Sequence, residues 1–244
     1  MPASIDAEEL SFTRDGDRLR GYGVWPRSGA PHPGLVLIHD VRGLSEHYRD
    51  VARRFAAEGF FTFALDLYSR EGAPDLPDMA AVFRWMRALP DGRVLDDIGA
   101  AVAVLAARSD VRTDAIGITG FCMGGQYALM AACTVKRLAA CVSWYGMLRY
   151  AETSELKPSS PLALAPRLGC PYLGLFGAED AIIPLADVEE LRAILTREGK
   201  TFEIMIYPGA GHAFFNDTRP DAYRPDAAAD SWARAVAFLH RHLG

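Results

Sequence analysis

Short apolar runs alternate along the chain with segments whose apolar residues recur at helical spacing. Continuous apolar runs are typical of strands buried on both faces of a sheet. Strands are predicted at residues 34–40, 60–66, 115–121, 138–146, 171–180 and 202–212, and helices at 45–59, within 79–108, from 123 onward, near 186–198 and near 227–242. This alternation predicts an α/β fold, with a mostly parallel sheet of about seven to eight strands and helices on both of its faces.

The beginning of the chain has a different pattern. Residues 11–25 carry a polar Arg-Asp-Gly-Asp turn between two short mixed runs, which predicts an antiparallel hairpin at one edge of the sheet. No repeat and no long linker divides the sequence, so residues 1–244 are expected to form one domain. For the Ser- and Pro-rich stretch 147–169, three interpretations stay open: a lid, a partner surface or an ordinary excursion.

Charge and composition narrow the choice of partners. The net charge of −5 gives no electrostatic reason to expect nucleic acid or an anionic membrane as a partner. No apolar run approaches the roughly 18 residues of a membrane-spanning helix. The N-terminus is acidic and does not resemble a secretory signal, so a cytoplasmic location is expected. The expected partner is a small molecule, and a homodimer is left open.

No two of the four cysteines form a Cys-x-x-Cys pair, which argues against a zinc site or a dithiol redox centre. Cys133, Cys141 and Cys170 lie in or beside apolar runs and are expected to be small buried residues. We therefore expect no metal and no organic cofactor, and Cys122 is the cysteine whose surroundings need another explanation.

Cys122 lies between a predicted strand and a predicted helix, where open α/β sheets place their sites. The sequence Gly-Phe-Cys-Met-Gly at 120–124 fits the nucleophile-elbow pattern, in which a sharp turn holds the nucleophile in a strained backbone conformation. The helix that begins at Met123 directs its free N–H groups at the thiol, which favours the reactive thiolate.

A thiol nucleophile needs a base and a residue that orients the base. His212 follows a predicted strand within Gly-Ala-Gly-His-Ala, and Asp180 ends another strand. The order nucleophile, acid, histidine is that of α/β-hydrolases. Asp180 is expected to fix the tautomer of His212, whereas Glu179 is expected to point to the opposite side. His39 is interpreted either as a pocket residue or as a satisfied core histidine.

Five segments carry a family resemblance: HDVRGLSEHYRDVARRFAAEGF, FALDLY, GFCMGG, GAEDAIIP and YPGAGHAFFNDTRPDAY. Together they resemble the dienelactone hydrolase family, cysteine-dependent α/β-hydrolases that open the lactone ring of carboxymethylenebutenolide. The resemblance extends from about residue 10 to the end of the chain. It implies Cys122, Asp180 and His212 as the catalytic triad, and the main-chain N–H groups of Val41 and Met123 as the oxyanion hole.

The chain departs from the family pattern at the substrate-binding positions. The best-known members carry a glutamate that modulates the thiol, and here the shorter Asp40 takes its place. Two arginines that bind the substrate carboxylate correspond to Asn216 and to a position near Ala103. Arg42 and Arg219 are candidate replacements. The reaction class is therefore expected to transfer better than the substrate.

Substrate contacts are also expected from aromatic residues after strand ends, namely Tyr68, Trp144 and Tyr145, with simple packing as the alternative. The predicted function is hydrolysis of an ester or lactone through an acyl-cysteine. A non-catalytic or redox-sensitive binding protein is the alternative. Gly-x-Cys-x-Gly-x-Gln also resembles class I glutamine amidotransferases, but no histidine here precedes a glutamate by two residues.

Overall fold

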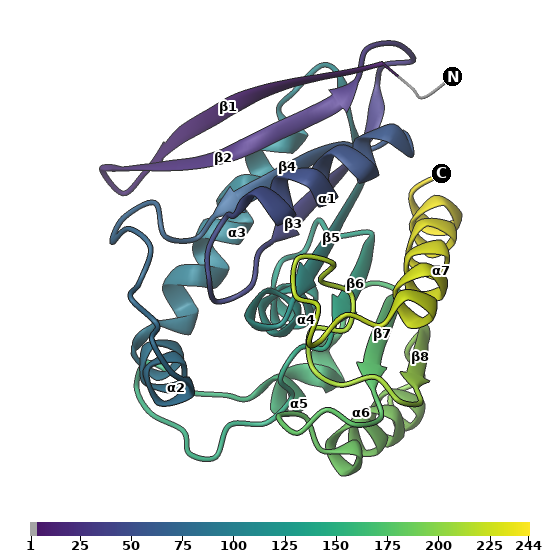
Figure 1. Cartoon of the computed structure of the whole chain (residues 1–244). Coiled ribbons are helices and arrows are strands. Elements are labelled where there is room, and N and C mark those ends of the chain that lie inside the picture. Colours follow the sequence, from purple (N-terminus) through teal and green to yellow (C-terminus); the bar gives the residue numbers. More distant parts are fainter. Residues whose placement is uncertain (1–3) are drawn as a thin grey trace.

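The computed structural model describes residues 4–244 and contains one eight-stranded sheet (Figure 1). The strand order is β1-β2-β4-β3-β5-β6-β7-β8. Strands β1 and β2 pair antiparallel, as do β2 and β4, and the strands from β4 to β8 run parallel. The predicted α/β fold and the strand number are confirmed. The strands are β1 (Ile5–Arg14), β2 (Asp17–Pro26), β3 (His32–Ile38), β4 (Phe61–Asp66), β5 (Val111–Phe121), β6 (Ala140–Trp144), β7 (Tyr172–Gly177) and β8 (Phe202–Tyr207).

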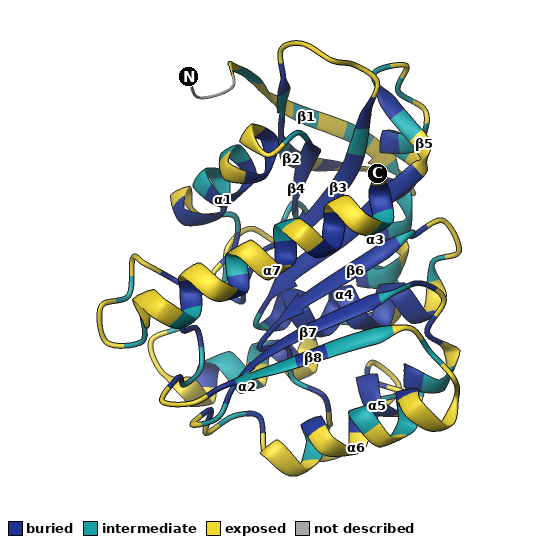
Figure 2. Ribbon diagram, turned by 90° about the vertical axis from the view of Figure 1, so that its right-hand side faces the viewer, coloured by how far each residue is buried: buried dark blue, intermediate teal, exposed yellow. Residues whose placement is uncertain are grey.

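Helices cover both faces of this sheet (Figure 2). Helices α1 and α7 pack on one face, and α3 and α4 pack on the other. Strands β3, β4 and β7 are buried almost throughout, which explains their continuous apolar sequences. The helices are α1 (Glu46–Ala57), α2 (Met79–Ala88), α3 (Asp91–Ala106), α4 (Met123–Thr134), α5 (Pro161–Leu164), α6 (Leu185–Arg197) and α7 (Pro225–Leu243), with a 3-10 turn at Ala165–Arg167.

The N-terminal hairpin forms the predicted sheet edge. Asp15 and Gly16 connect β1 and β2, and both have positive φ angles, 51° and 85°, as the tightest hairpin turns require. The hairpin is longer than predicted, because β1 already begins at Ile5. Its first residues are polar and lie at an exposed edge, so they give no apolar signal.

The parallel strands bring together residues that are far apart in the sequence. Ile38 in β3 pairs with Gly120 in β5, and Gly177 in β7 pairs with Tyr207 in β8. The segments that follow these four strands therefore leave the sheet at one end. Every helix within residues 4–244 is too short or too polar to cross a membrane.

Candidate active site

Cys122 occupies the turn between β5 and α4, with φ 55° and ψ −116°. This left-handed conformation is strained for any residue with a side chain. The two neighbouring glycines make the turn possible. A Cβ atom at Gly120 would lie 2.0 Å from the Gly124 carbonyl oxygen, and one at Gly124 would lie 2.2 Å from the Ile38 oxygen. The local geometry is that of a nucleophile elbow, and its thiol lines a cavity at the end of the sheet.

His212 and Asp180 meet on the same side of the sheet as Cys122. Asp180 follows β7, and its side chain is 1% exposed. Its Oδ1 accepts hydrogen bonds from the main-chain N–H groups of Ile182 (2.8 Å) and Ile183 (3.2 Å). Its Oδ2 lies 2.8 Å from His212 Nδ1. The carboxylate is therefore fixed at three points, and it holds the imidazole with Nδ1 protonated.

The other ring nitrogen, His212 Nε2, is buried and has no hydrogen-bond partner among residues 4–244. Burial lowers the pKa of His212, but the negative charge of Cys122 and the hydrogen bond to Asp180 outweigh it and raise this pKa to about 10. The protonated imidazolium is thus the favoured form of His212. Nε2 is the nitrogen free to exchange a proton with a reacting group.

Two residues from different elements bring main-chain N–H groups to the lining of this cavity. Val41 follows β3 and Met123 begins α4, and both residues line the cavity. Neither N–H donates to a main-chain oxygen within residues 4–244. The Val41 segment is held from behind, because the Tyr68 hydroxyl donates to the Val41 carbonyl oxygen at 2.7 Å. Two free donors at fixed positions are the arrangement that stabilises an oxyanion.

Asp40 also lines the cavity. Its Oδ1 accepts a hydrogen bond from the Arg42 N–H at 2.8 Å, and its main-chain oxygen accepts one from Gly43. These bonds make a tight turn that presents Val41. Asp40 therefore shapes the loop, and no hydrogen bond joins its carboxylate to the Cys122 thiol in the described chain.

The remaining wall of the cavity at Cys122 is mostly apolar. The cavity has a volume of about 150 Å³. Its apolar wall comes chiefly from α2, whereas Arg42 and Arg219 bring positive charge. The Arg219 guanidinium has one acidic neighbour, Asp221 at 3.4 Å. The apolar residues are Met79, Val82, Phe83, Met86, Met147 and Ile182.

Several residues expected to touch substrate lie elsewhere. Asn216 is buried, and its Oδ1 accepts bonds from the Thr218 N–H and hydroxyl, so it stabilises its own loop. Ala103, near which the second arginine of the family pattern falls, is on the exposed side of α3. The Tyr68 hydroxyl donates to the Val41 carbonyl oxygen. Asn216 and Tyr68 lie outside the lining of the cavity at Cys122, and direct substrate contact by either residue stays a prediction.

Trp144 and Tyr145 belong to the packing layer beneath the site. Trp144 is fully buried against Phe121, and its indole N–H donates to Thr119. Tyr145 is also buried, has φ 39°, and places its ring edge-on to His212 at 5.2 Å between centroids. Tyr145 lies outside the cavity lining, which favours the packing alternative, and its contact with substrate stays a prediction.

Sequence reasoning missed Tyr48 and the residues of α2. Tyr48 is buried, and the pKa of its hydroxyl is raised by burial and then by the charges of Asp40, Tyr145 and Cys122. It therefore lies close to Asp40, Tyr145 and Cys122. Tyr48 occupies an apolar helical position in α1, which is typical of a core residue. Helix α2 follows a Pro- and Asp-containing loop and carries no motif that is typical of an active site.

The other candidates from the sequence have structural surroundings. His39 is fully buried, with Nδ1 bound to the Asp40 main-chain oxygen and Nε2 accepting from the Leu67 N–H. It is a satisfied core histidine, and burial lowers its pKa. Cys133, Cys141 and Cys170 are free and buried. Within residues 4–244, no group of three His, Cys, Asp or Glu side chains is arranged to hold a metal ion.

The fold, the elbow after β5 and the following acid and histidine define an α/β-hydrolase. The model of the dienelactone hydrolase family matches residues 19–243, and the chain belongs to this family. The resemblance predicted from the sequence is thereby confirmed. Members hydrolyse ester or lactone bonds, so the chain belongs to the carboxylic ester hydrolases.

Individual relatives cover nearly the whole chain. A candidate carboxymethylenebutenolidase of Escherichia coli strain K12 is 37% identical over 99% of this chain and 89% of its own length. A Bradyrhizobium protein, a candidate 2-oxo-3-(5-oxofuran-2-ylidene)propanoate lactonase, is 36% identical over 98% of this chain and 96% of its own. The crystal structure of a candidate dienelactone hydrolase from Klebsiella pneumoniae is similar with a TM-score of 0.92 and 36% identity, covering 98% and 99% of the two chains.

Proposed function

We propose that the protein hydrolyses small esters or lactones through an acyl-cysteine intermediate formed on Cys122. The observation that carries this proposal is one cavity lined by the Cys122 thiol, His212 and two residues with free main-chain N–H groups, Val41 and Met123. A nucleophile, an oriented base and an oxyanion site are the three parts that acyl transfer requires. No step of this mechanism needs a metal or an organic cofactor.

The first half-reaction forms the thioester. The Cys122 thiolate attacks the carbonyl carbon, and the resulting oxyanion accepts hydrogen bonds from the N–H groups of Val41 and Met123. When the carbon–oxygen bond to the leaving group breaks, His212 Nε2 donates its proton to the departing oxygen. Asp180 keeps Nδ1 protonated throughout, so that only Nε2 exchanges protons.

The second half-reaction releases the acid. Neutral His212 takes a proton from water at Nε2, and the hydroxide attacks the thioester carbonyl. The carbon–sulfur bond breaks, the thiolate returns and the carboxylic acid leaves. A thiolate is a better leaving group than an ordinary alkoxide, so the first intermediate collapses forward most readily when the leaving group is enolate-like. Activated esters and enol lactones are therefore the favoured substrates, and amides are poor ones.

Two relatives bear the names of enzymes for anionic unsaturated lactones, a carboxymethylenebutenolidase and a furanylidene-propanoate lactonase. Arg42 and Arg219 at the cavity wall are the cations available here for a substrate carboxylate. Arg219→Met is expected to lower kcat/KM for a dienelactone by about tenfold and to leave a neutral acetate ester unchanged. Equal losses on both substrates would show that Arg219 does not bind the carboxylate.

The central test compares wild type with Cys122→Ser on p-nitrophenyl acetate and a dienelactone. Mass spectrometry of quenched wild type is expected to show an acyl adduct on Cys122, and the serine variant is expected to lose nearly all activity. Cys170→Ser, which changes a buried thiol elsewhere, is the matched control and should keep its activity. A wild type that neither cleaves these substrates nor becomes acylated at Cys122 would favour a non-catalytic binding protein.

A further inference from the structure

A second, larger cavity lies beside the cavity at Cys122. Its volume is about 450 Å³, against about 150 Å³ at the thiol. Ligand sites usually span about 300 to 1,000 Å³, so the space at Cys122 alone is too small for most substrates. Phe83, Met86 and Met147 line both cavities. A substrate bound at Cys122 therefore extends into the larger cavity across an apolar threshold.

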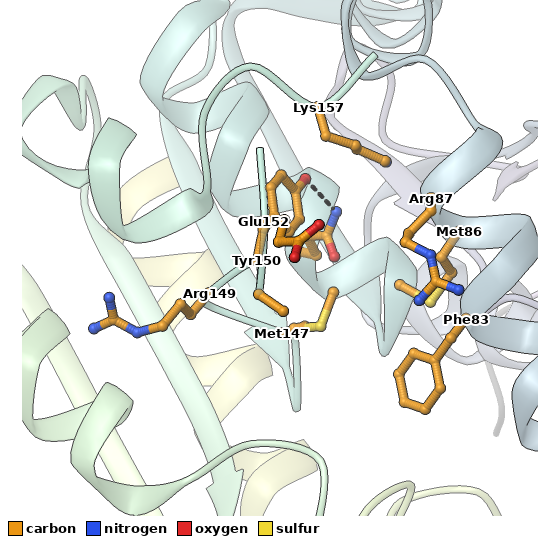
Figure 3. A pocket seen from close by; sticks show the side chains of 10 residues that line it. Phe83, Met86, Arg87, Met147, Arg149, Tyr150, Glu152 and Lys157 are labelled. Atoms are coloured by element: carbon orange, nitrogen blue, oxygen red, sulfur yellow. Dashed lines mark hydrogen bonds between the residues drawn. The ribbon is translucent and has the colours of Figure 1, made fainter. Parts of the chain in front are cut away.

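The larger cavity has two walls (Figure 3). Helix α2 contributes Phe83, Met86 and Arg87, which face the segment from Met147 to Lys157 across the opening. Most of the accessible lining is apolar, and the methionines and the phenylalanine are flexible or flat surfaces that accept aliphatic groups. The charged side chain of Arg149 on the second wall is already paired with Asp187 at 2.9 Å.

A buried polar network holds the second wall in place. The Lys157 ammonium lies 2.5 Å from Asp91 Oδ1 and donates to the Tyr127 hydroxyl at 2.8 Å. Tyr150 donates to Asp91 Oδ2 and accepts a bond from Gln126, both at 2.8 Å. Asp91 and Lys157 are almost fully buried. Because these bonds tie the loop to α3 and α4, the cavity is formed before substrate arrives.

The position of the base decides which part of a substrate enters this cavity. The leaving oxygen must lie at His212 Nε2, because that nitrogen protonates it. His212, Ala213 and Arg219 line the cavity at Cys122 but do not line the larger one. The larger cavity therefore extends away from the leaving group, on the acyl side of the carbonyl carbon.

We infer that this second cavity, walled by α2 and the 147–157 loop, is an acyl-chain subsite that selects substrates with an apolar acyl group longer than acetyl. The inference rests on the proposed function and adds the acyl specificity to it. It also assigns a role to the loop after β6: its first residues form one wall of the subsite, and Lys157 anchors it to the domain.

A third cavity provides the competing location for the chain. It has a volume of about 380 Å³ and shares only Arg42 with the cavity at Cys122. Its lining includes Arg20, Arg49, Glu9 and Asp66. The larger cavity also carries the charged residues Arg87, Arg149, Glu152 and Lys157. Most of its accessible lining is nevertheless apolar, whereas about half of the lining of the third cavity is polar. An aliphatic chain gains more from leaving water for the more apolar lining, so the larger cavity is favoured.

Two alanines allow a matched test. Ala151 is exposed and lines the larger apolar cavity, whereas Ala73 is exposed and lines the charged one. Neither lines the cavity at Cys122. Ala151→Trp and Ala73→Trp each fill one cavity with the same side chain. The assay is kcat/KM for p-nitrophenyl acetate, butyrate and hexanoate, with circular dichroism as a check of the fold.

Wild type is expected to prefer butyrate over acetate by about tenfold, because two further CH₂ groups leave water. Ala151→Trp is expected to cut this ratio to about one while acetate hydrolysis stays within twofold, and Ala73→Trp is expected to keep the wild-type ratio. Loss of the ratio in Ala73→Trp alone, or a ratio near one in wild type, would refute the acyl subsite while leaving ester hydrolysis intact. A wild type that cleaves no ester would refute the proposed function and the subsite with it.

Discussion

The hydrogen bond between Asp180 and His212 provides a sharp test of the catalytic assignment. Asp180→Asn keeps an oxygen for the N–H groups of Ile182 and Ile183, so the loop should retain its shape. The second oxygen, 2.8 Å from Nδ1, is replaced by an amide that donates. The imidazole must then accept at Nδ1, which moves its proton to Nε2 and blocks that nitrogen as a base.

The size of the effect follows from the charge state of His212. Its pKa rises from 6.5 to about 10 against the cost of burial, through Cys122 and Asp180. At about 1.4 kcal/mol per pKa unit, the preference for the imidazolium is about 5 kcal/mol. Asp180 supplies part of this preference through its hydrogen bond and its charge, and its loss also leaves the imidazole in the wrong tautomer. We expect kcat to fall by about 10³ to 10⁴.

The assay is hydrolysis of p-nitrophenyl acetate from pH 5 to 10, together with NMR of ¹⁵N-labelled histidines to read the tautomer and titration of His212. Glu179→Gln is the matched control, because this neighbouring carboxylate is exposed and hydrogen bonds from its side chain are absent from the described structure. It should behave as wild type. An Asp180→Asn variant within tenfold of wild type, with an unchanged His212 titration, would refute the proposed role of the pair.

Three further predictions concern stability and positioning. The protonation of His212 contributes fully to the free energy of unfolding below pH 6.5, and this contribution is lost as the pH approaches 10. The difference in free energy of unfolding between wild type and His212→Gln, measured by urea unfolding, should therefore become smaller from pH 6.5 to 10. A difference that stays constant over this range would contradict the raised pKa of His212. Lys157→Ala leaves buried Asp91 without its cation and should lower the free energy of unfolding by about 3 kcal/mol, and a loss below about 1 kcal/mol would show that the pair is dispensable. Tyr68→Phe frees the Val41 carbonyl and should lower kcat for p-nitrophenyl acetate about tenfold at unchanged KM; a change confined to KM would indicate substrate contact instead.

The parts of the site that were predictable from the sequence are those set by the backbone. The elbow around Cys122 is defined by glycines that no other residue can replace at such short separations, so the motif carries its own geometry. Asp180 and His212 were found because parallel strands deliver their ends to one edge of the sheet. The boundaries of the buried strands β3 and β4 were predicted within two residues, since burial on both faces leaves an apolar run, whereas β8 ends five residues earlier than predicted.

The features of the site that the sequence did not predict depend on the directions in which side chains point. Asn216 occupies the position of a substrate-binding residue in the resemblance, yet its amide turns back to Thr218. Tyr48 has the sequence appearance of a core residue and lies close to Asp40, Tyr145 and Cys122. The α2 wall is placed by packing between elements distant in sequence. Single-residue patterns do not encode which way such side chains point.

The left-handed backbone at Cys122 sets the folding stability of the protein against its activity. A non-glycine residue in such a conformation costs about 1 to 3 kcal/mol, a large share of the 5 to 15 kcal/mol that keeps a typical domain folded. Glycine at this position would relieve the strain and make a sturdier molecule, but one without a thiol. The surrounding sheet and helix thus hold Cys122 in a strained backbone conformation. A more stable variant of this fold, with glycine at this position, would lack the nucleophile.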